Sequence, residues 1–256
     1  MGTQAAHAQP TTDPRVADLV NAGKVRVGIG LGSATLAIKN PATGEVRGPA
    51  LDLARALAAR IGIDLQPVEY PRPGAVIEGV RTNAWDVAFL IIDPARAAEA
   101  DFSAPYMESD FTYLVPAGSS IRSLADVDQP GVRVANPTGD AAGLLLSRRL
   151  KRAQLVRPES IAAAVDLLRT GGADARAGPR PVLLSEAARL PGYRVLDEGF
   201  ATISFAALVP KGNPGRLAYV GEFIEEAKSS GLVKRTIESA GLRGVQVAPA
   251  GKPGTR

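Results

Sequence analysis

The sequence lacks cysteine and has little histidine, which removes several classes of chemistry at the start. Among 256 residues there is no cysteine, and the only histidine is His7. The chain therefore has no disulfide, no thiolate nucleophile and no cysteine-ligated metal. His7 lies in an N-terminal stretch without hydrophobic pattern, so most histidine-based catalytic groups and nearly all zinc sites are excluded. We expect no cofactor and no metal.

Aromatic residues and long apolar runs are also scarce. Aromatics make up 5% of the chain, and the net charge of +4 comes from basic residues scattered among acidic ones. Both features argue against nucleic-acid binding. The longest apolar run, at 87–92, has the length of a strand and not of a membrane helix. With 45% hydrophobic and 22% charged residues, the composition is that of a soluble protein with one large or two modest domains.

The N-terminus carries one processing signal. Ala6-His7-Ala8, followed by Gln9-Pro10, matches the small-x-small end of an export signal, although no apolar segment precedes it. The alternative is an alanine-rich tail. We expect an exported, periplasmic protein whose signal peptide has been removed from this chain.

Strand and helix patterns alternate along most of the sequence. This order predicts parallel α/β units, a first set before residue 115 and a second after it. The expected strands are 25–29, 63–68, 86–92, 131–135 and 173–177, and the expected helices are 51–61, 75–80, 140–150, 161–169, 217–227 and 232–240.

Two predicted strands end in the same sequence, Leu-Val-Pro-x-Gly, at 114–118 and at 208–212. They bracket the second α/β set, so the chain is predicted to cross into a second lobe and return, unless the repetition is chance. The paired strands would be a hinge, and the cleft between the lobes would bind the ligand. We therefore expect an N-terminal tail at 1–23, a first lobe at 24–115 plus 206–242, a second lobe at 116–205 and a loose C-terminal tail at 243–256.

The turn Asp93-Pro94-Ala95-Arg96 follows the most apolar strand and starts a helix. Asp93 is a good N-cap and Pro94 suits the first helical position. A guanidinium beside free backbone N–H groups would attract an anion. Equally, Arg96 could form a surface ion pair with Asp93, Glu99 or Asp101. The turn alone does not decide between these interpretations.

Several motifs in order make the chain similar to family 3 extracellular solute-binding proteins, the receptors of bacterial amino-acid-type ABC importers. The resemblance runs from Lys24 to Leu242. It rests on Gly48 with 52–54 (Asp-Leu-Ala), 94–96 (Pro-Ala-Arg) with 101–106 (Asp-Phe-Ser-Ala-Pro-Tyr), 124–127 (Leu-Ala-Asp-Val), 173–175 (Ala-Asp-Ala) and 230–232 (Ser-Gly-Leu). It implies two α/β lobes that close over a small solute, with Arg96 clamping the solute's carboxylate. It also implies that the importer's membrane subunits are partners and that the protein is a monomer.

In that family, the turn matching Thr138-Gly139-Asp140 binds the same carboxylate through its amides, although Pro137 stands where a glycine is usual. The aspartate that holds a ligand ammonium is replaced by Pro179, which offers no charge. In the family an aromatic side chain covers the ligand, but the matching position here, near Leu36, is aliphatic. The turn containing Leu90 and Ile91 is shorter than in the family. These departures predict a carboxylate ligand that is not a free α-amino acid, because a buried ammonium needs a partner.

Asp140 or Glu78 could replace the missing acid, although a helix-start charge and a solvated helix face explain them more simply. Asp52 is likewise expected at a helix start, and Trp85 is expected in the core or as surface cover and not as a residue that stacks on a ligand. The first competing class is a cyclohexadienyl dehydratase-like enzyme on the same fold, which would need a cleft carboxyl group with a shifted pKa. The second is a regulatory sensor domain, which would need a DNA-binding module or membrane spans beyond the two lobes.

Overall fold

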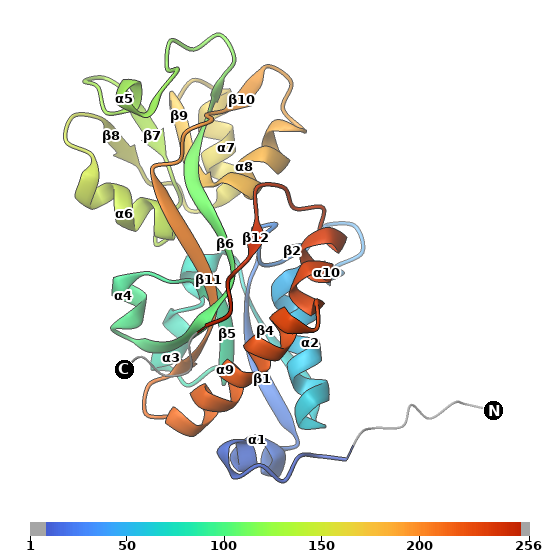
Figure 1. Ribbon diagram of the computed structural model, residues 1–256. Coiled ribbons are helices and arrows are strands. Elements are labelled where there is room, and N and C mark those ends of the chain that lie inside the picture. Colours follow the sequence, from blue (N-terminus) through green and yellow to red (C-terminus); the bar gives the residue numbers. More distant parts are fainter. Residues whose placement is uncertain (1–8, 252–256) are drawn as a thin grey trace.

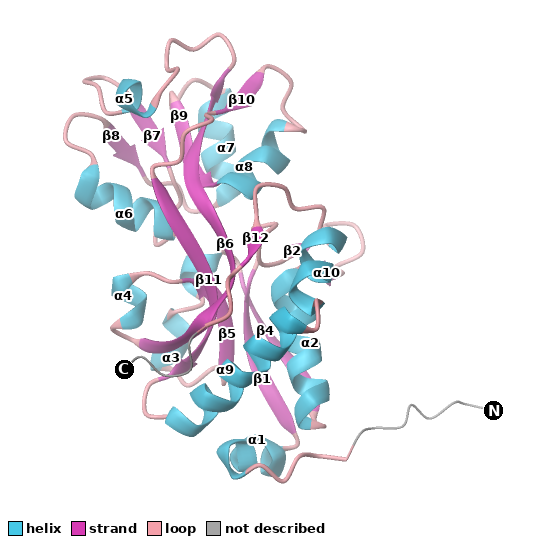
Figure 2. Cartoon of the chain, viewed as in Figure 1, coloured by secondary structure: helices cyan, strands magenta, loops and turns pink. Residues whose placement is uncertain are grey.

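The computed structural model describes residues 9–251 and shows two lobes, one above the other in Figure 1. His7 and the tripeptide at 6–8 lie outside the described residues. Each lobe has strands at its centre and helices on the outside, as the colouring by secondary structure in Figure 2 makes plain. The predicted fold class, two α/β lobes joined by two strands, is confirmed.

One sheet runs through both lobes, with the strand order β4-β1-β5-β11-β6-β9-β7-β8; β10 and β12 also pair with β6. Within each lobe the pairs β1/β4, β1/β5, β7/β8 and β7/β9 are parallel. The strands of this sheet are β1 (Lys24–Gly30), β4 (Asp64–Tyr70), β5 (Val87–Ile91), β6 (Ala100–Pro116), β7 (Arg133–Ala135), β8 (Gln154–Val156), β9 (Ala175–Pro179), β10 (Tyr193–Val195), β11 (Ala201–Pro210) and β12 (Gln246–Val247). A separate ribbon pairs β2 (Ile38–Lys39) with β3 (Val46–Arg47).

The helices flank these strands. They are η1 (Pro14–Val16), α1 (Ala17–Ala22), α2 (Pro49–Ile61), η2 (Pro73–Ala75), α3 (Glu78–Arg81), α4 (Pro94–Ala97), α5 (Leu124–Val127), α6 (Ala141–Arg149), α7 (Ile161–Arg169), α8 (Arg180–Ala187), α9 (Pro214–Ser229) and α10 (Leu232–Ser239). Within residues 9–251, none of these helices has the length and apolar character needed to cross a membrane.

The two longest strands, β6 and β11, join the lobes. They pair antiparallel from Ala100↔Pro210 to Phe111↔Ala201, with irregularities near Ala206. In Figure 1 both strands extend through the lower and the upper lobe, in opposite chain directions. The predicted lobe boundaries, 115/116 and 205/206, fall inside these strands. A bend in either strand would therefore change the angle between the lobes.

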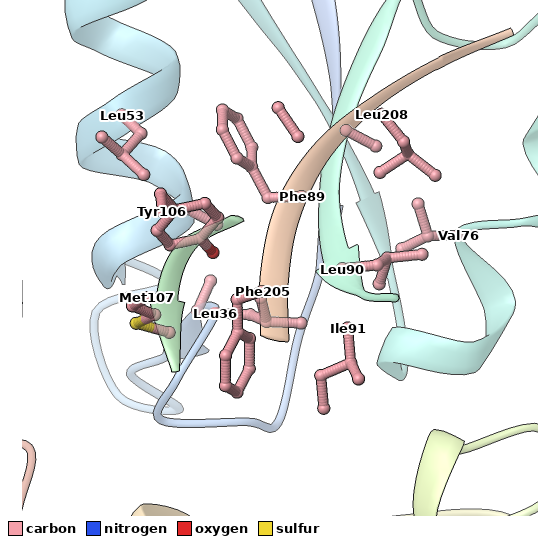
Figure 3. Close-up of a cluster of buried hydrophobic side chains, with 14 of the residues drawn as sticks. Leu36, Leu53, Val76, Phe89, Leu90, Ile91, Tyr106, Met107, Phe205 and Leu208 are labelled. Carbon is pink, nitrogen blue, oxygen red and sulfur yellow. The ribbon is translucent and has the colours of Figure 1, made fainter. Parts of the chain in front are cut away.

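The core of the first lobe reaches the cleft without interruption. Leu53 and Leu57, four residues apart on the helix expected at 51–61, are fully buried on α2. Figure 3 shows Leu36, Leu90 and Ile91 in the same cluster as Phe89 and Phe205. These three residues therefore belong both to the core and to the wall of the cleft.

Two local predictions were wrong, and two short elements were not predicted. The helix expected at 75–80 is two short turns, and the N–H of Gly79 donates to the Val76 carbonyl in the i+3 pattern of a 3₁₀ turn. Trp85, fully buried as expected, donates its indole N–H to the same carbonyl at 2.9 Å. The tail after Leu242 is not loose throughout, because β12 pairs with β6 and Ala248 is buried. Finally, the strand β8 and the short helix α5 had no counterpart among the expected elements.

Candidate ligand-binding cleft

A cavity lies between the lobes at the level where β5 and β9 end. Its lining comes from the first lobe (Ser33, Thr35, Leu36, Pro73, Leu90, Ile91, Arg96), from the second lobe (Asn136, Asp140, Ala141, Ala142, Ile161, Arg176, Ala177, Gly178, Pro179, Val182) and from Phe111 on β6. The space inside measures about 30 Å³, which is room for a few water molecules at most. The lobes are therefore close together, and a solute would have to enter with the lobes further apart.

Arg96 projects into this cavity from the turn that follows β5. Asp93 caps the helix as predicted, accepting the N–H of Ala95 at 2.8 Å. The Arg96 side chain is 3% exposed and donates to the carbonyl oxygens of Ile91 and Gly139, each at 3.0 Å. Among the described residues no carboxylate lies within 4.0 Å of it, and Glu99 pairs with Arg81 instead. The surface ion pair considered from the sequence is wrong.

Gly139 and Asp140 bring the second lobe to Arg96. Asp140 precedes α6, but its side chain makes no capping hydrogen bond. Its Oδ1 atom is buried, and no group in the described part of the chain donates a hydrogen bond to it. Burial raises the pKa of the Asp140 carboxyl, while the charges of Arg96, Arg176 and Arg72 and the N–H of Gly74 act to lower it. Asp140 is thus a buried carboxyl group in the cleft, close to three guanidinium groups. Its position at the start of a helix does not by itself explain this environment.

The structure brings together six of the eight residues expected to bind ligand: Leu36, Leu90, Ile91, Arg96, Asp140 and Pro179 all line the cavity. The other two, Thr138 and Gly139, lie beside it and present carbonyl oxygens to Arg72 and Arg96. Glu78 does not reach the cavity, because its side chain is 67% exposed and lies 3.6 Å from Arg72. Asp52 sits in the first turn of α2, as expected.

Sequence reasoning missed four polar residues of the cleft. Ser33 and Thr35 are buried, with their hydroxyl oxygens 2.8 Å apart. Asn136 donates to the Ala177 carbonyl at 3.0 Å, and its Oδ1 atom has no partner. Arg176 lies within β9, where a charged residue between two alanines was a visible signal. The hydroxyl groups lie in a loop far from Arg96 in sequence, and no local pattern marked them.

The lobes touch at two glycines. A Cβ atom on Gly74 would lie 2.8 Å from the carbonyl oxygen of Gly139, so only glycine permits this approach. Beside them Arg72, in the first lobe, donates to the Thr138 carbonyl at 2.7 Å. Gly139 itself has a φ of +76°, which a side chain would strain.

Two α/β lobes, two connecting strands and an arginine-bearing cavity between the lobes define a type II periplasmic binding protein. Residues 25–240 match the family described as bacterial extracellular solute-binding proteins, family 3. The chain belongs to this family, as its motifs predicted.

Relatives and solved structures agree with this assignment. The glutamine-binding protein of Geobacillus stearothermophilus is 29% identical over 183 residues, which is 70% of each chain. The ABC transporter glutamine-binding protein of Bacillus subtilis is 24% identical over 212 residues, covering 81% of this chain and 77% of the relative. An ancestral amino acid-binding protein, a precursor of cyclohexadienyl dehydratase, superposes with a TM-score of 0.78 at 26% identity over 88% of this chain and 97% of the other. The L-arginine-bound AbpA of Streptococcus pneumoniae gives a TM-score of 0.80 at 22% identity over 88% and 97% of the two chains, which shows the shared fold.

Proposed function

We propose that this protein is the periplasmic receptor of an ABC importer and binds a small solute with a carboxylate but no α-ammonium group. The lobes would close over the solute, and the closed form would engage the importer's membrane subunits. The observation that carries the proposal is Arg96, a buried guanidinium that lines the cavity and has only carbonyl oxygens as acceptors.

Lobe separation would expose this guanidinium to a solute. The bond from Arg96 to Gly139 crosses between the lobes, so it breaks when they part. A carboxylate arriving there replaces a neutral acceptor with a charged one, and charge-assisted hydrogen bonds are about twice as strong as neutral ones. The arginine fork also suits the two oxygens of a carboxylate.

The surroundings of Asp140 argue against an ammonium group. Asp140 is the one carboxylate that residues 9–251 contribute to the cavity lining, and the charges of Arg96, Arg176 and Arg72 all act on it. An ammonium placed beside Asp140 would also face the guanidinium of Arg96, which has no carboxylate within 4.0 Å among the described residues, whereas Arg72 and Arg176 are paired with Glu78 and Glu186. Pro179 lines the cavity at the position where the resemblance places the amine-binding aspartate, and it offers neither charge nor N–H. The cleft therefore favours an anion over a zwitterion.

Thermal unfolding with matched solutes tests this proposal. We expect pentanoate or 3-phenylpropanoate to stabilise the protein, and their α-amino counterparts, norvaline and phenylalanine, to do so much less. A ligand at a hundred times its Kd adds about 2.7 kcal/mol, which is roughly 5–11 °C for a chain of this size. If the amino acids raise the melting temperature and the plain acids do not, the proposed solute class is wrong.

Arg96→Gln supplies the variant for the same assay. Losing one charge-assisted contact should weaken acid binding by about 10- to 100-fold. Arg81→Gln is the matched control, because Arg81 is an exposed arginine that pairs with Glu99 outside the cavity. Equal acid affinities for the two variants would remove Arg96 from the ligand site.

An enzyme on the same fold is a second candidate, and one observation favours it. The carboxyl groups that the sequence offers for this role are those of Asp52, Glu78, Asp93 and Asp140. Of these, Asp140 alone lines the cavity, and burial raises its pKa, as a general acid requires. A dehydratase would therefore use Asp140. Incubation with prephenate or arogenate separates the candidates, because only an enzyme forms product.

A further inference from the structure

The cleft contains a second buried guanidinium, Arg176, whose hydrogen-bonding capacity is largely unused. Its side chain is 2% exposed and lines the cavity from the second lobe. The Nη1 atom donates to the Ala177 carbonyl at 3.3 Å, an oxygen that Asn136 already shares. The Nε atom is buried and has no hydrogen-bond acceptor among residues 9–251. Arginine carries five N–H donors, and buried ones normally find acceptors.

The structure around Arg176 holds the guanidinium in place. The side chain runs along β9 over Gly178, where a Cβ atom would lie 2.6 Å from Nη1. The carboxylate of Glu186, on α8, lies 2.9 Å from Nη2. Neither Glu186 oxygen makes a hydrogen bond, and both are buried. The two residues thus balance each other's charge while Arg176 keeps donors free.

We infer that Arg176 is a second polar contact for the solute, and that the solute carries a neutral oxygen, a carbonyl or a hydroxyl, in addition to its carboxylate. This inference rests on the proposed function. Because Glu186 already balances the charge of Arg176, the additional group is neutral and not a second carboxylate. Arg96 from the first lobe and Arg176 from the second would then hold two different groups of one molecule, so the solute itself would tie the lobes together.

The cavity also indicates where the rest of the solute extends. Ile161 and Val182 line the cavity and also line a wider groove of about 490 Å³ that opens outward between the lobes. An apolar chain attached to the two oxygen-bearing groups would pass these side chains. An oxo or hydroxy acid with an aliphatic or aromatic tail fits this arrangement.

A five-carbon series of acids tests the inference by calorimetry on the full chain. The probes are pentanoate, 2-oxopentanoate, 4-oxopentanoate and glutarate. For the unmodified protein, we expect one oxo acid to bind about tenfold or more tightly than pentanoate, the effect of a hydrogen bond from a charged donor. Equal affinities for pentanoate and both oxo acids, or tightest binding of glutarate, would overturn the inference without any variant.

A double variant assigns the preference to Arg176. Arg176→Met/Glu186→Met removes both charges together, because leaving one buried charge unpaired is strongly destabilising. The ratio between its affinities for the oxo acid and for pentanoate should fall to about one; a retained ratio overturns the inference. If neither pentanoate nor 3-phenylpropanoate binds the unmodified protein, the proposed function is wrong. If the acids bind but the protein does not prefer an oxo acid, only the inference about Arg176 is wrong.

Discussion

At the scale of single residues, the buried charges of the cleft differ in how well they are satisfied. Arg96 donates to two carbonyl oxygens, whereas Arg176 and Asp140 each keep a buried polar atom without a partner. Unsatisfied buried groups cost free energy of folding, so a stable protein keeps few of them. Such atoms also occur elsewhere in the described residues, but Asn136, Asp140 and Arg176 bring three of them to one cavity, where a bound solute could supply the missing partners.

Asp140→Asn should stabilise the protein near neutral pH. Burial raises the pKa of Asp140 in the folded state above its ordinary value of 3.8, so the ionised form disfavours folding. As pH falls through the raised pKa, the folded state takes up a proton more readily than the unfolded state, and the unmodified protein gains stability. Urea unfolding across this range should therefore show the advantage of the asparagine variant shrinking toward lower pH. An advantage that grows toward lower pH would contradict this account.

At the scale of elements, the hinge strand β6 receives support from the end of the chain. Val247 pairs with Met107, and the Ala248 N–H donates to the Tyr106 carbonyl at 3.0 Å. These contacts lie where β6 leaves the first lobe's core, beside the fully buried Tyr106. Residues 246–248 therefore stabilise the part of the hinge nearest the first lobe.

Truncation after Leu242 should lower the free energy of unfolding by about 1–3 kcal/mol, since backbone hydrogen bonds and the buried Ala248 are lost. Denaturant titration measures the change. A truncation after Gly251 keeps all of these contacts and is the matched control. If the two truncated chains unfold at the same denaturant concentration, β12 contributes nothing to the hinge.

At the scale of the whole molecule, the two lobes meet where Gly74 lies against Gly139. A Cβ atom at position 74 would lie 2.8 Å from the Gly139 carbonyl oxygen and 2.7 Å from Arg72 Nη1. The first of these contacts exists only while the lobes are together. The same substitution is tolerable in the open form if Arg72, a flexible side chain, moves aside.

Gly74→Ala should therefore prevent full closure while leaving each lobe folded. Small-angle X-ray scattering with a bound acid should show a decrease in radius of gyration for the unmodified protein and a smaller decrease for the variant. Gly118→Ala is the control, because a Cβ atom there would meet nothing within 4 Å. A full decrease in Gly74→Ala would show that closure does not bring these two glycines together.

Much of the fold followed from local patterns in the sequence. The four-residue spacing of Leu53, Leu57 and Ile61 predicted α2, and Asp93-Pro94 predicted the start of α4. The motifs around Arg96 indicated the family before any geometry was known. Patterns failed where a distant side chain competes for a local hydrogen bond, as Trp85 does at Val76.

The sequence by itself determined the order of α/β units, the strand pair that joins the lobes and the family, because each depends on short-range periodicity and motifs. It could not decide what Arg96 contacts, because Gly139 is 43 residues away and reaches it only when the lobes meet. Nor could it place Arg176 and Glu186 together, since that pairing depends on how α8 packs against β9. Burial and pairing of charges are properties of packing between distant segments, so only the tertiary structure decided the polar character of the cleft.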